Sequence, residues 1–348
     1  MIKIGDRIIS EDSPVFIIAE AGVNHNGDLA VAKQMIDAAL EAGVDAVKFQ
    51  TYRTEEMITV DAKKADYQLK RTEITETQYA MLKKYELSPE DHRELVGYCR
   101  NKGLIFLSTP YDLASVDLLS HLGVLCFKIS SGDLTNLPFL SYIAGQKKPI
   151  ILSTGMSNLG EIERAVLTIE KSGNSEIVLL HCTTNYPTAY QDVNLKAMIT
   201  LKNAFQYHVG YSDHTEGIII SLAAVSMGAR IIEKHFTLDR RLPGPDHQAS
   251  LEPKELQELV TSIRYIERAM GNGVKRCVLS EEKNKEIARK KIVLACDVSK
   301  GTVITKKELA LKRADKGLAS THLDLLIGHK VNRDLFKDHA IEFFDLDD

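Results

Sequence analysis

The sequence has few of the features that assign a chain to a specialised class of protein. No apolar stretch approaches the roughly 20 residues that a membrane-spanning helix requires. The first seven residues carry no long apolar region behind a basic end, so they do not predict a secretory signal peptide. The net charge of −4 gives no electrostatic reason to expect nucleic acid as a partner. We therefore expect neither a membrane nor a nucleic acid among its partners.

Cysteine is also scarce, and its pattern excludes a disulfide framework. The five cysteines are odd in number and scattered, with no Cys-x-x-Cys pair: Cys99, Cys126, Cys182, Cys277 and Cys296. This pattern predicts buried free thiols in a reducing cytoplasm.

The chain does contain one unit repeated about eight times: a short apolar run, a polar or ionisable cluster, and an amphipathic helix. Alternating strands and helices predict a parallel sheet, and about eight of them predict a closed (β/α)8 TIM barrel. The first helix is expected to follow Asp28 as N-cap and to end at Gly43. Strands are expected near residues 15–19, 46–49, 105–107, 126–129, 150–152, 177–180, 208–211 and 231–232.

The 348 residues exceed the roughly 250 of a bare barrel, so a second domain is expected. We predict a barrel over residues 1–273, a charged linker over 274–284 and a small β-rich domain over 285–348. An N-terminal hairpin around Gly5-Asp6 would cap the bottom of the barrel. Short β signals mark the small domain at residues 292–295, 302–304 and 341–343.

Residues 53–88 interrupt this rhythm with a charged stretch that contains one helical patch at residues 80–85. A long connection after a barrel strand lies on the active-site face, so the segment is either a lid or a solvated insertion.

Two imidazoles lie just past neighbouring strands of the predicted barrel, because His214 follows the seventh strand and His235 follows the eighth. A pair of histidines at the mouth of a barrel is typical of a divalent metal site with open positions. Spacing alone does not choose between manganese, magnesium, iron and zinc.

A lysine, Lys48, stands two residues before Gln50, so both side chains point into the predicted barrel. Lys128 ends the fourth strand in the same way. Together with the strand-end hydroxyls they would form a socket for phosphate and carboxylate groups. The alternative is that these lysines form internal salt bridges with Glu20 and Glu233. The hydroxyls in question are those of Thr109, Ser131, Ser153 and Ser212.

The two acidic residues, Glu20 and Glu233, would orient hydroxyl groups or move a proton, and the sequence does not assign their roles. The proline-rich loop at residues 242–247 either presents Asp246 to a substrate or uses it only to end the turn.

Seven motifs, in order along the chain, resemble those of the sialic acid synthases, a family that includes the legionaminic acid synthases. The C-terminal stretch from Lys290 is similar to the antifreeze-type (SAF) domain of the same enzymes. The motifs are FIIAEAGVNHNG (16–27), VKFQT (47–51), LSTP (107–110), LSTGM (152–156), LHCTTNYP (180–187), GYSDH (210–214) and IEKHF (232–236).

This resemblance implies that phosphoenolpyruvate condenses with an open-chain N-acylated hexose, typically N-acetylmannosamine, and water. The products would be phosphate and a nine-carbon 2-keto acid, N-acetylneuraminic acid. It implies Mn²⁺ or Mg²⁺ held by His214 and His235, and catalytic roles for Glu20, Lys48, His214 and Glu233. Phosphoenolpyruvate would contact Lys48, Thr109, Lys128, Ser131, Ser153, Asn185 and Ser212. The sugar would contact Glu20, Gln50, Tyr186, Asp246 and Arg313.

The resemblance also implies a homodimer in which the small domain is swapped, so that Arg313 reaches the sugar pocket of the partner. Family members usually read Arg-Pro-Gly-Asn-Gly at this point, whereas this chain reads Arg-Ala-Asp-Lys-Gly over residues 313–317. Loss of the proline and one glycine changes the backbone conformations open to the turn.

Three other functions remain open at the level of sequence. One is the same chemistry on 2,4-diacetamido-trideoxy-mannose, the precursor of legionaminic acid. The others are a metal-dependent aldolase or phosphohydrolase, and a sugar-binding protein with a degenerate site.

Overall fold

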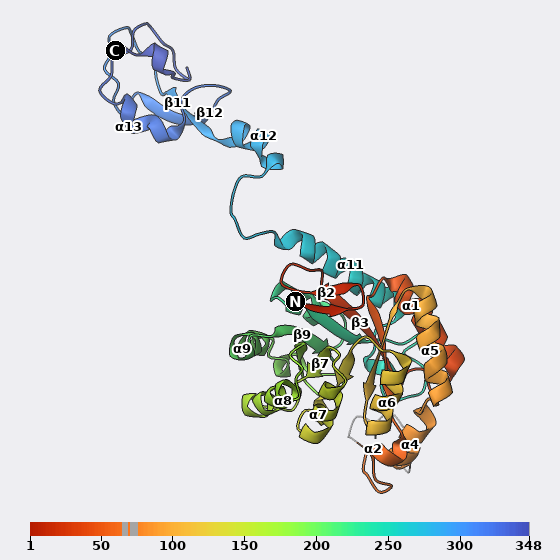
Figure 1. Cartoon of the computed structure of the whole chain (residues 1–348). Helices are drawn as coiled ribbons and strands as arrows, with labels where there is room; N and C mark the ends of the chain where they lie inside the picture. The colour runs from red at the N-terminus through yellow and green to blue at the C-terminus, as the bar shows by residue number, and fades with distance from the viewer. Residues whose placement is uncertain (65–68, 70–75, 348) are drawn as a thin grey trace. The chain divides into compact units, whose positions relative to one another are not determined.

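The computed structural model of the chain describes residues 1–64, 69 and 76–347. The chain divides into two compact units, Met1–Gly271 and Asn272–Asp348 (Figure 1). Part of the predicted lid, residues 65–68 and 70–75, lies outside the described residues. No helix in the described part is long and apolar enough to cross a membrane.

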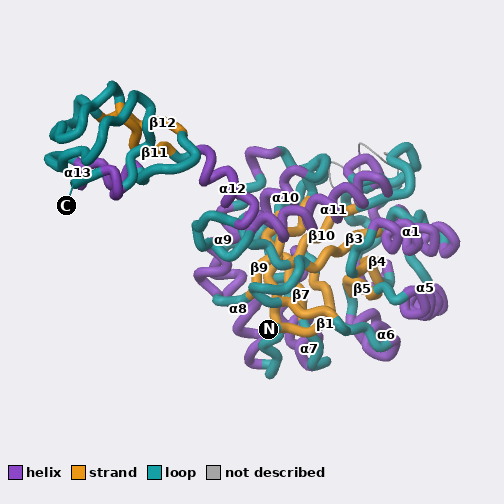
Figure 2. Tube along the Cα trace, turned by 90° about the horizontal axis from the view of Figure 1, so that it is seen from above, coloured by secondary structure: helices purple, strands orange, loops and turns teal. Residues whose placement is uncertain are grey.

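The first unit is the predicted (β/α)8 barrel. Its eight strands pair in parallel in the order β5-β4-β3-β10-β9-β8-β7-β6, and β5 lies in contact with β6 at the two ends of this order. Figure 2 shows the strands surrounded by helices. The strands are β3 (Phe16–Gly22), β4 (Ala46–Thr51), β5 (Ile105–Pro110), β6 (Phe127–Ile129), β7 (Ile150–Ser153), β8 (Ile177–Cys182), β9 (His208–Asp213) and β10 (Ile231–His235).

The outer helices begin and end at residues that favour helix termini. The Asp28 side chain accepts hydrogen bonds from the backbone amides of Ala30 and Val31, and Gly43 ends the first helix with φ of 81°, as predicted. The helices of this unit are α1 (Leu29–Ala42), α2 (Thr54–Met57), α4 (Gln78–Tyr85), α5 (Pro89–Lys102), α6 (Leu113–Leu122), α7 (Leu137–Gly145), α8 (Leu159–Lys171), α9 (Lys196–Phe205), α10 (Ile219–Ser226) and α11 (Pro253–Met270).

The barrel interior changes from apolar to polar along the strands. A hairpin of β1 (Ile2–Ile4) and β2 (Arg7–Ile9) packs its buried isoleucines against the lower, apolar layer, so it caps the bottom as predicted. Alternate residues further along each strand are polar, for example Lys48 after Ala46 and Glu233 after Ile231. Because successive inward positions are two residues apart, each strand carries its last inward side chain to the same end of the barrel.

The second unit is smaller and has fewer regular strands than the sequence suggests. It contains β11 (Lys290–Leu294) paired antiparallel with β12 (Leu309–Arg313), and the short helix α13 (Leu323–Leu326). The expected strands at residues 302–304 and 341–343 form no regular strand, and isolated bridges join Val303 to Lys330 and Val293 to Ala340. Half of the predicted linker is helical, because α12 (Leu279–Ala288) begins there.

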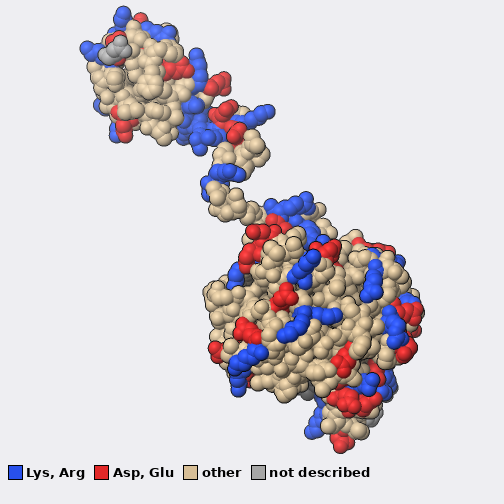
Figure 3. All heavy atoms as spheres, viewed as in Figure 1, with Lys and Arg blue, Asp and Glu red and all other residues tan. Residues whose placement is uncertain are grey.

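The expectation of buried thiols holds for three cysteines and is wrong for two. All five are free, but Cys277 and Cys296 are exposed. Cys277 lies in the polar segment before α12, and Cys296 follows β11 in a turn, so neither position faces an apolar core. On the face of the first unit shown in Figure 3, acidic and basic side chains alternate without a continuous patch of one sign.

Candidate active site

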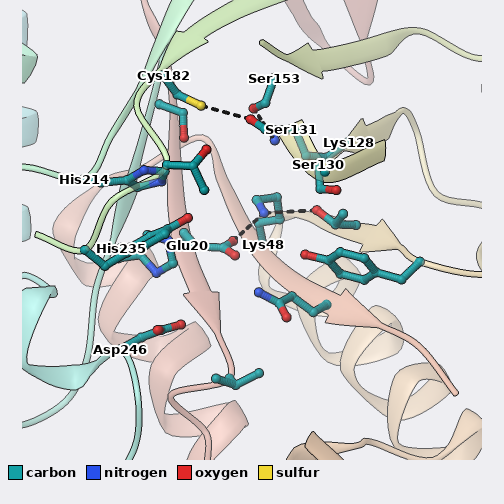
Figure 4. Close-up of a pocket in the computed structure, with 18 of the residues that line it drawn as sticks. Glu20, Lys48, Lys128, Ser130, Ser131, Ser153, Cys182, His214, His235 and Asp246 are labelled. Atoms are coloured by element: carbon teal, nitrogen blue, oxygen red, sulfur yellow. Dashed lines mark hydrogen bonds and ion pairs between the residues drawn. The ribbon is translucent and has the colours of Figure 1, made fainter. Parts of the chain in front are cut away.

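A cavity of about 400 Å³ opens at the carboxyl ends of the barrel strands. Figure 4 shows side chains from opposite sides of the barrel pointing toward one another in it. Asn185 is exposed in the loop after β8 and is not among the lining residues, and Arg313 belongs to the second unit. The predicted residues that do line the cavity are Glu20, Lys48, Gln50, Thr109, Lys128, Ser131, Ser153, Tyr186, Ser212, His214, Glu233, His235 and Asp246.

Buried lysines and carboxylates alternate across the floor of this cavity. Lys48 Nζ lies 2.8 Å from Glu20 Oε2 and 3.8 Å from Glu233 Oε2, while Lys128 Nζ lies 3.5 Å from Glu233 Oε1. Lys48 also donates to Thr109 Oγ1 at 3.1 Å. The internal salt bridges considered from sequence are therefore present, and they coexist with the hydroxyl groups of the proposed anion socket.

Small hydroxyl donors surround Lys128 on the β6–β7 side. Lys128 Nζ donates to Ser153 Oγ at 2.7 Å, and Ser131 Oγ accepts from the backbone amide of Gly155 at 3.0 Å. Ser131 Oγ also lies 3.1 Å from the Sγ of Cys182, which lines the cavity. Ammonium and hydroxyl donors at this density are suited to the oxygens of a phosphate or carboxylate.

Glu20, Gln50 and Asp246 converge on Gly22. Figure 4 shows Asp246 and Ser153 at opposite sides of the cavity. A Cβ placed on Gly22 would lie 3.4 Å from Glu20 Oε1 and 3.7 Å from both Asp246 Oδ2 and Gln50 Nε2. Gly22 has φ of 53°, in the left-handed region that favours glycine. The chain thus brings two carboxylates and an amide to one point, a donor and acceptor set suited to hydroxyl groups.

The two predicted histidines lie together, with ring centroids 5.4 Å apart, and Tyr186 packs 4.1 Å from His214. The His214 Nδ1 hydrogen bond to the carbonyl oxygen of Thr183, at 2.7 Å, requires a proton on Nδ1 and leaves the Nε2 lone pair available. His235 Nδ1 is buried and has no hydrogen-bond partner among the described residues.

Both imidazoles are neutral at neutral pH. Burial lowers the pKa of His214 to about 4. Burial, followed by the nearby His214 and the lysines, lowers the pKa of His235 well below its usual value. Neutral rings with an available lone pair meet the chemical requirement for metal ligands. Among residues 1–64, 69 and 76–347, no group of three or more His, Cys, Asp or Glu side chains is arranged to hold a metal ion.

The residues that immediately precede the two histidines, Asp213 and Lys234, form a buried ion pair. Lys234 Nζ lies 3.0 Å from Asp213 Oδ2, and the two side chains are 1% and 0% exposed. Asp213 also accepts from Ser221 Oγ at 2.6 Å, which joins β9 to α10. Since Asp213 and Lys234 point away from the barrel interior, the pair holds the strand ends that carry the histidines.

Lys234→Met is expected to lower the free energy of unfolding by about 3–5 kcal/mol, because it leaves the Asp213 carboxylate buried without its cation. Urea unfolding of the purified chain measures this change. The double variant Asp213→Asn/Lys234→Met should recover part of the loss, because the uncompensated charge is gone. A single variant within about 1 kcal/mol of the parent would contradict the buried-charge argument.

Glu20 and Glu233 differ in protonation although they share the same lysine. Burial raises the pKa of Glu20 to about 7, and the Glu233 carboxylate adds to the rise against the opposing effect of Lys48. Burial acts on Glu233 too, but Lys128 and Lys48 outweigh it and lower its pKa. Glu233 is therefore ionised at neutral pH, whereas Glu20 exists in both protonation states and is able to exchange a proton.

Glu20→Gln is expected to remove a pH dependence of stability. With a folded-state pKa of about 7 and an ordinary value of 4.5, the folded chain binds more protons than the unfolded chain between these values. Its free energy of unfolding therefore falls as pH rises through that window, and glutamine abolishes this term. In urea unfolding without ligands, the free energy of unfolding of the variant minus that of the parent should be larger at pH 8 than at pH 5. Equal differences at the two pH values would place the Glu20 pKa near its ordinary value.

Sequence reasoning missed an apolar wall of the same cavity. Met57, Met81, Leu82 and Tyr111 line it, and all four belong to one apolar cluster built on Tyr52. Three of them come from the connection between β4 and β5. The helical patch at residues 80–85 was the only signal in the sequence, and its charged neighbours hid the apolar face.

Comparison with known proteins places the chain in a family. The NeuB family profile matches residues 35–275, and the SAF domain profile matches residues 289–346. A barrel of this kind with this second domain defines the class of sugar-acid synthases, and the chain belongs to the NeuB family.

Two relatives are N,N'-diacetyllegionaminic acid synthases. The protein of Campylobacter jejuni is 51% identical, with 93% of this chain and 98% of the relative covered. That of Legionella pneumophila is 48% identical, with 92% and 91% covered. A solved structure, the N-acetylneuraminic acid (sialic acid) synthetase of Leptospira borgpetersenii in complex with citrate, is 38% identical with a TM-score of 0.73. The match covers 82% of the present chain and 95% of the Leptospira chain.

Proposed function

We propose that the chain condenses phosphoenolpyruvate with open-chain 2,4-diacetamido-2,4,6-trideoxy-mannose and water, giving N,N'-diacetyllegionaminic acid and phosphate. C3 of phosphoenolpyruvate forms the new bond to the aldehyde carbon, and the aldehyde oxygen takes a proton. Water adds at C2, and the C2–O bond to phosphate breaks to leave the 2-keto acid.

The observation that carries the proposal is the buried pair Lys48 and Lys128, surrounded by hydroxyls, beside two neutral imidazoles. Two buried ammonium groups are costly unless anions pair with them, and Glu20 is only partly ionised at neutral pH. Glu233 supplies one full negative charge, and the phosphate and carboxylate groups of phosphoenolpyruvate would complete the pairing of the two lysines. In this proposal Thr109, Ser131, Ser153 and Ser212 add hydrogen bonds to it.

The choice of sugar follows the comparisons. The resemblance in sequence favoured N-acetylmannosamine as substrate, with the diacetamido sugar as the alternative. The higher identity to two N,N'-diacetyllegionaminic acid synthases, 51% and 48% against 38% for the sialic acid synthetase, supports the alternative instead. Glu20, Gln50, Tyr186 and Asp246 would contact its polar groups.

We also propose that His214 and His235 hold Mn²⁺ or Mg²⁺. Their neutral state, the fixed tautomer of His214 and the unpartnered Nδ1 of His235 fit a pair of ligands. Such an ion supplies Lewis-acid polarisation of the aldehyde oxygen. The residues themselves position the reactants: Lys48 and Lys128 orient the enol phosphate, Glu233 orients the reacting carbon of the sugar, and Glu20 exchanges a proton with a sugar hydroxyl.

A homodimer with exchanged C-terminal domains completes the proposal, with Arg313 binding the N-acyl group of the partner's sugar. Arg313 ends β12 and is exposed. The test is complementation: chains carrying Lys48→Met and chains carrying Arg313→Ala, each impaired alone, are unfolded and refolded together. If each site draws on two chains, mixed dimers contain one intact site and about a quarter of the activity returns. Activity no higher than the sum of the two separate variants would contradict the exchange.

The proposed reaction is tested with a panel of N-acylated hexoses offered with phosphoenolpyruvate and Mn²⁺. Phosphate release and product mass are measured for each sugar. The proposal expects the diacetamido sugar to give the highest kcat/KM and a new nine-carbon acid. Phosphate release that does not depend on the sugar would indicate a phosphohydrolase, and sugar binding without phosphate release would indicate a binding protein.

A further inference from the structure

Resting on the proposed function, we infer that Met57, Met81 and Leu82 form a pocket for the C6 methyl group of a 6-deoxy sugar, and so select it over a hexose with a hydroxyl there. The cavity has two chemically different sides. Lysines and serines form one part of the lining, and the apolar cluster forms the apolar side. A ligand that fills the cavity must therefore carry charged groups as well as apolar substituents.

The apolar side is fixed rather than loosely placed. Tyr52, two residues after Gln50, donates its hydroxyl to the carbonyl oxygen of Leu82 at 3.0 Å. Glu86 accepts from the Thr54 hydroxyl at 2.6 Å, which joins the end of α4 to the start of α2. Met81 and Leu82 are 1% and 7% exposed. Rigid apolar walls discriminate by contact, because they do not rearrange to satisfy a hydroxyl group.

The apolar side adjoins the sugar end of the cavity. A Cβ on Gly27, in the loop after β3, would collide with the carbonyl oxygen of Lys84, so this loop touches the backbone of α4. Burial raises the pKa of the Tyr52 and Tyr85 phenols, with Glu86 and Glu76 as the next causes, and the Asp246 carboxylate makes a smaller contribution to both. Asp246 is also one of the groups that converge on Gly22.

The assignment to C6 follows from what the other groups take. In the proposed function the aldehyde faces the histidines and one N-acyl group faces Arg313. The hydroxyl groups and the amide of the second N-acyl group, at C4, face Glu20, Gln50 and Asp246. The deoxygenated C6 end is then the part that remains for an apolar surface. A hydroxyl at C6 would be buried against Met81 and Leu82 without a hydrogen-bond partner from them.

The test uses two sugars that differ only at C6, N-acetylmannosamine and 2-acetamido-2,6-dideoxy-mannose, each with saturating phosphoenolpyruvate and Mn²⁺. The parent enzyme should favour the 6-deoxy sugar by about 10- to 100-fold in kcat/KM, the range expected for one group in an apolar pocket. Met81→Gln should bring this ratio to within about threefold of unity while KM for phosphoenolpyruvate stays within about twofold.

Two further variants keep the result interpretable. Met57→Gln changes a half-buried position of the same wall and should lower the ratio even where Met81→Gln unfolds the cluster. Met156→Gln makes the same chemical change at an exposed residue that lines the cavity from the β7–α8 side, and should leave the ratio unchanged. A parent ratio near unity, or a fall in kcat/KM that is equal for both sugars in the wall variants, would overturn the inference. Failure of the proposed function is a separate outcome, since it shows as no phosphate release from the diacetamido sugar.

Discussion

Lys48→Met is expected to raise the KM for phosphoenolpyruvate by roughly 30- to 5,000-fold. The estimate corresponds to about 2–5 kcal/mol for truncating one partner of a buried, hydrogen-bonded charge pair. Lys48 is 4% exposed and contacts Glu20, Glu233 and Thr109. Its removal therefore also leaves the two carboxylates without the cation that they share. Initial rates over a range of phosphoenolpyruvate concentrations, at saturating sugar and metal, measure the effect.

Lys202→Met is the matched control for this prediction. Lys202 also pairs with a glutamate, Glu11, but the two side chains are 48% and 51% exposed, and exposed pairs contribute little. Its kinetic constants should stay within about twofold of the parent. An unchanged KM in Lys48→Met would move the enol phosphate away from this lysine and leave Lys128 as the principal cation.

The barrel and the polar end of its interior were predictable because both follow from a two-residue period. In β4, Ala46, Lys48 and Gln50 share the inward face, and the same alternation places Glu233 and His235 beyond Ile231 in β10. No tertiary information is needed to decide which residues point inward once a strand is located. The eight strand ends then meet at one face because the sheet is parallel and closed.

The connections between strands could not be predicted in the same way. Asn185 belongs to a strand-end motif, yet it is exposed in the loop after β8 and does not line the cavity, whereas its neighbour Tyr186 does. Met57 and Met81 are separated by 23 residues, eight of them charged, and become neighbours only through the packing of α2 against α4. Loop conformation depends on tertiary contacts, for which one sequence carries no periodic signal.

In the small domain, the apolar core could be predicted from the sequence but the regular strands could not. Its apolar residues were located correctly, since Ile292, Ile304 and Ile341 are all fully buried in one cluster. The expected strand at residues 302–304 instead makes an isolated bridge, because its neighbours are turns rather than a second extended run. Short β signals therefore identified the core of this unit better than its hydrogen-bonded ladders.

Removal of divalent metal is expected to stop turnover, and His235→Ala is expected to reproduce most of that loss in the presence of metal. The reasoning rests on the lone pairs of two neutral imidazoles that lie together at the cavity floor, one with its tautomer fixed by Thr183. Without an ion, the two neutral imidazoles supply no positive charge to the aldehyde oxygen as its negative charge develops, and losing an oriented cation costs several kcal/mol of transition-state stabilisation. The enzyme is dialysed against a chelator and assayed before and after addition of Mn²⁺ or Mg²⁺.

Binding of Mn²⁺ itself, followed by titration calorimetry without substrates, separates ligand loss from other effects of the substitution. Affinity should fall at least about 10-fold in His235→Ala and in His214→Ala. His181→Ala is the matched control, since this imidazole also lies at the end of a barrel strand, β8. It hydrogen-bonds to the carbonyl oxygen of Val193 at 2.7 Å and does not line the cavity. Its Mn²⁺ affinity should equal that of the parent. Full turnover in chelated, metal-free enzyme would refute the metal site, and the imidazoles would then act on the substrate only as neutral hydrogen-bonding groups.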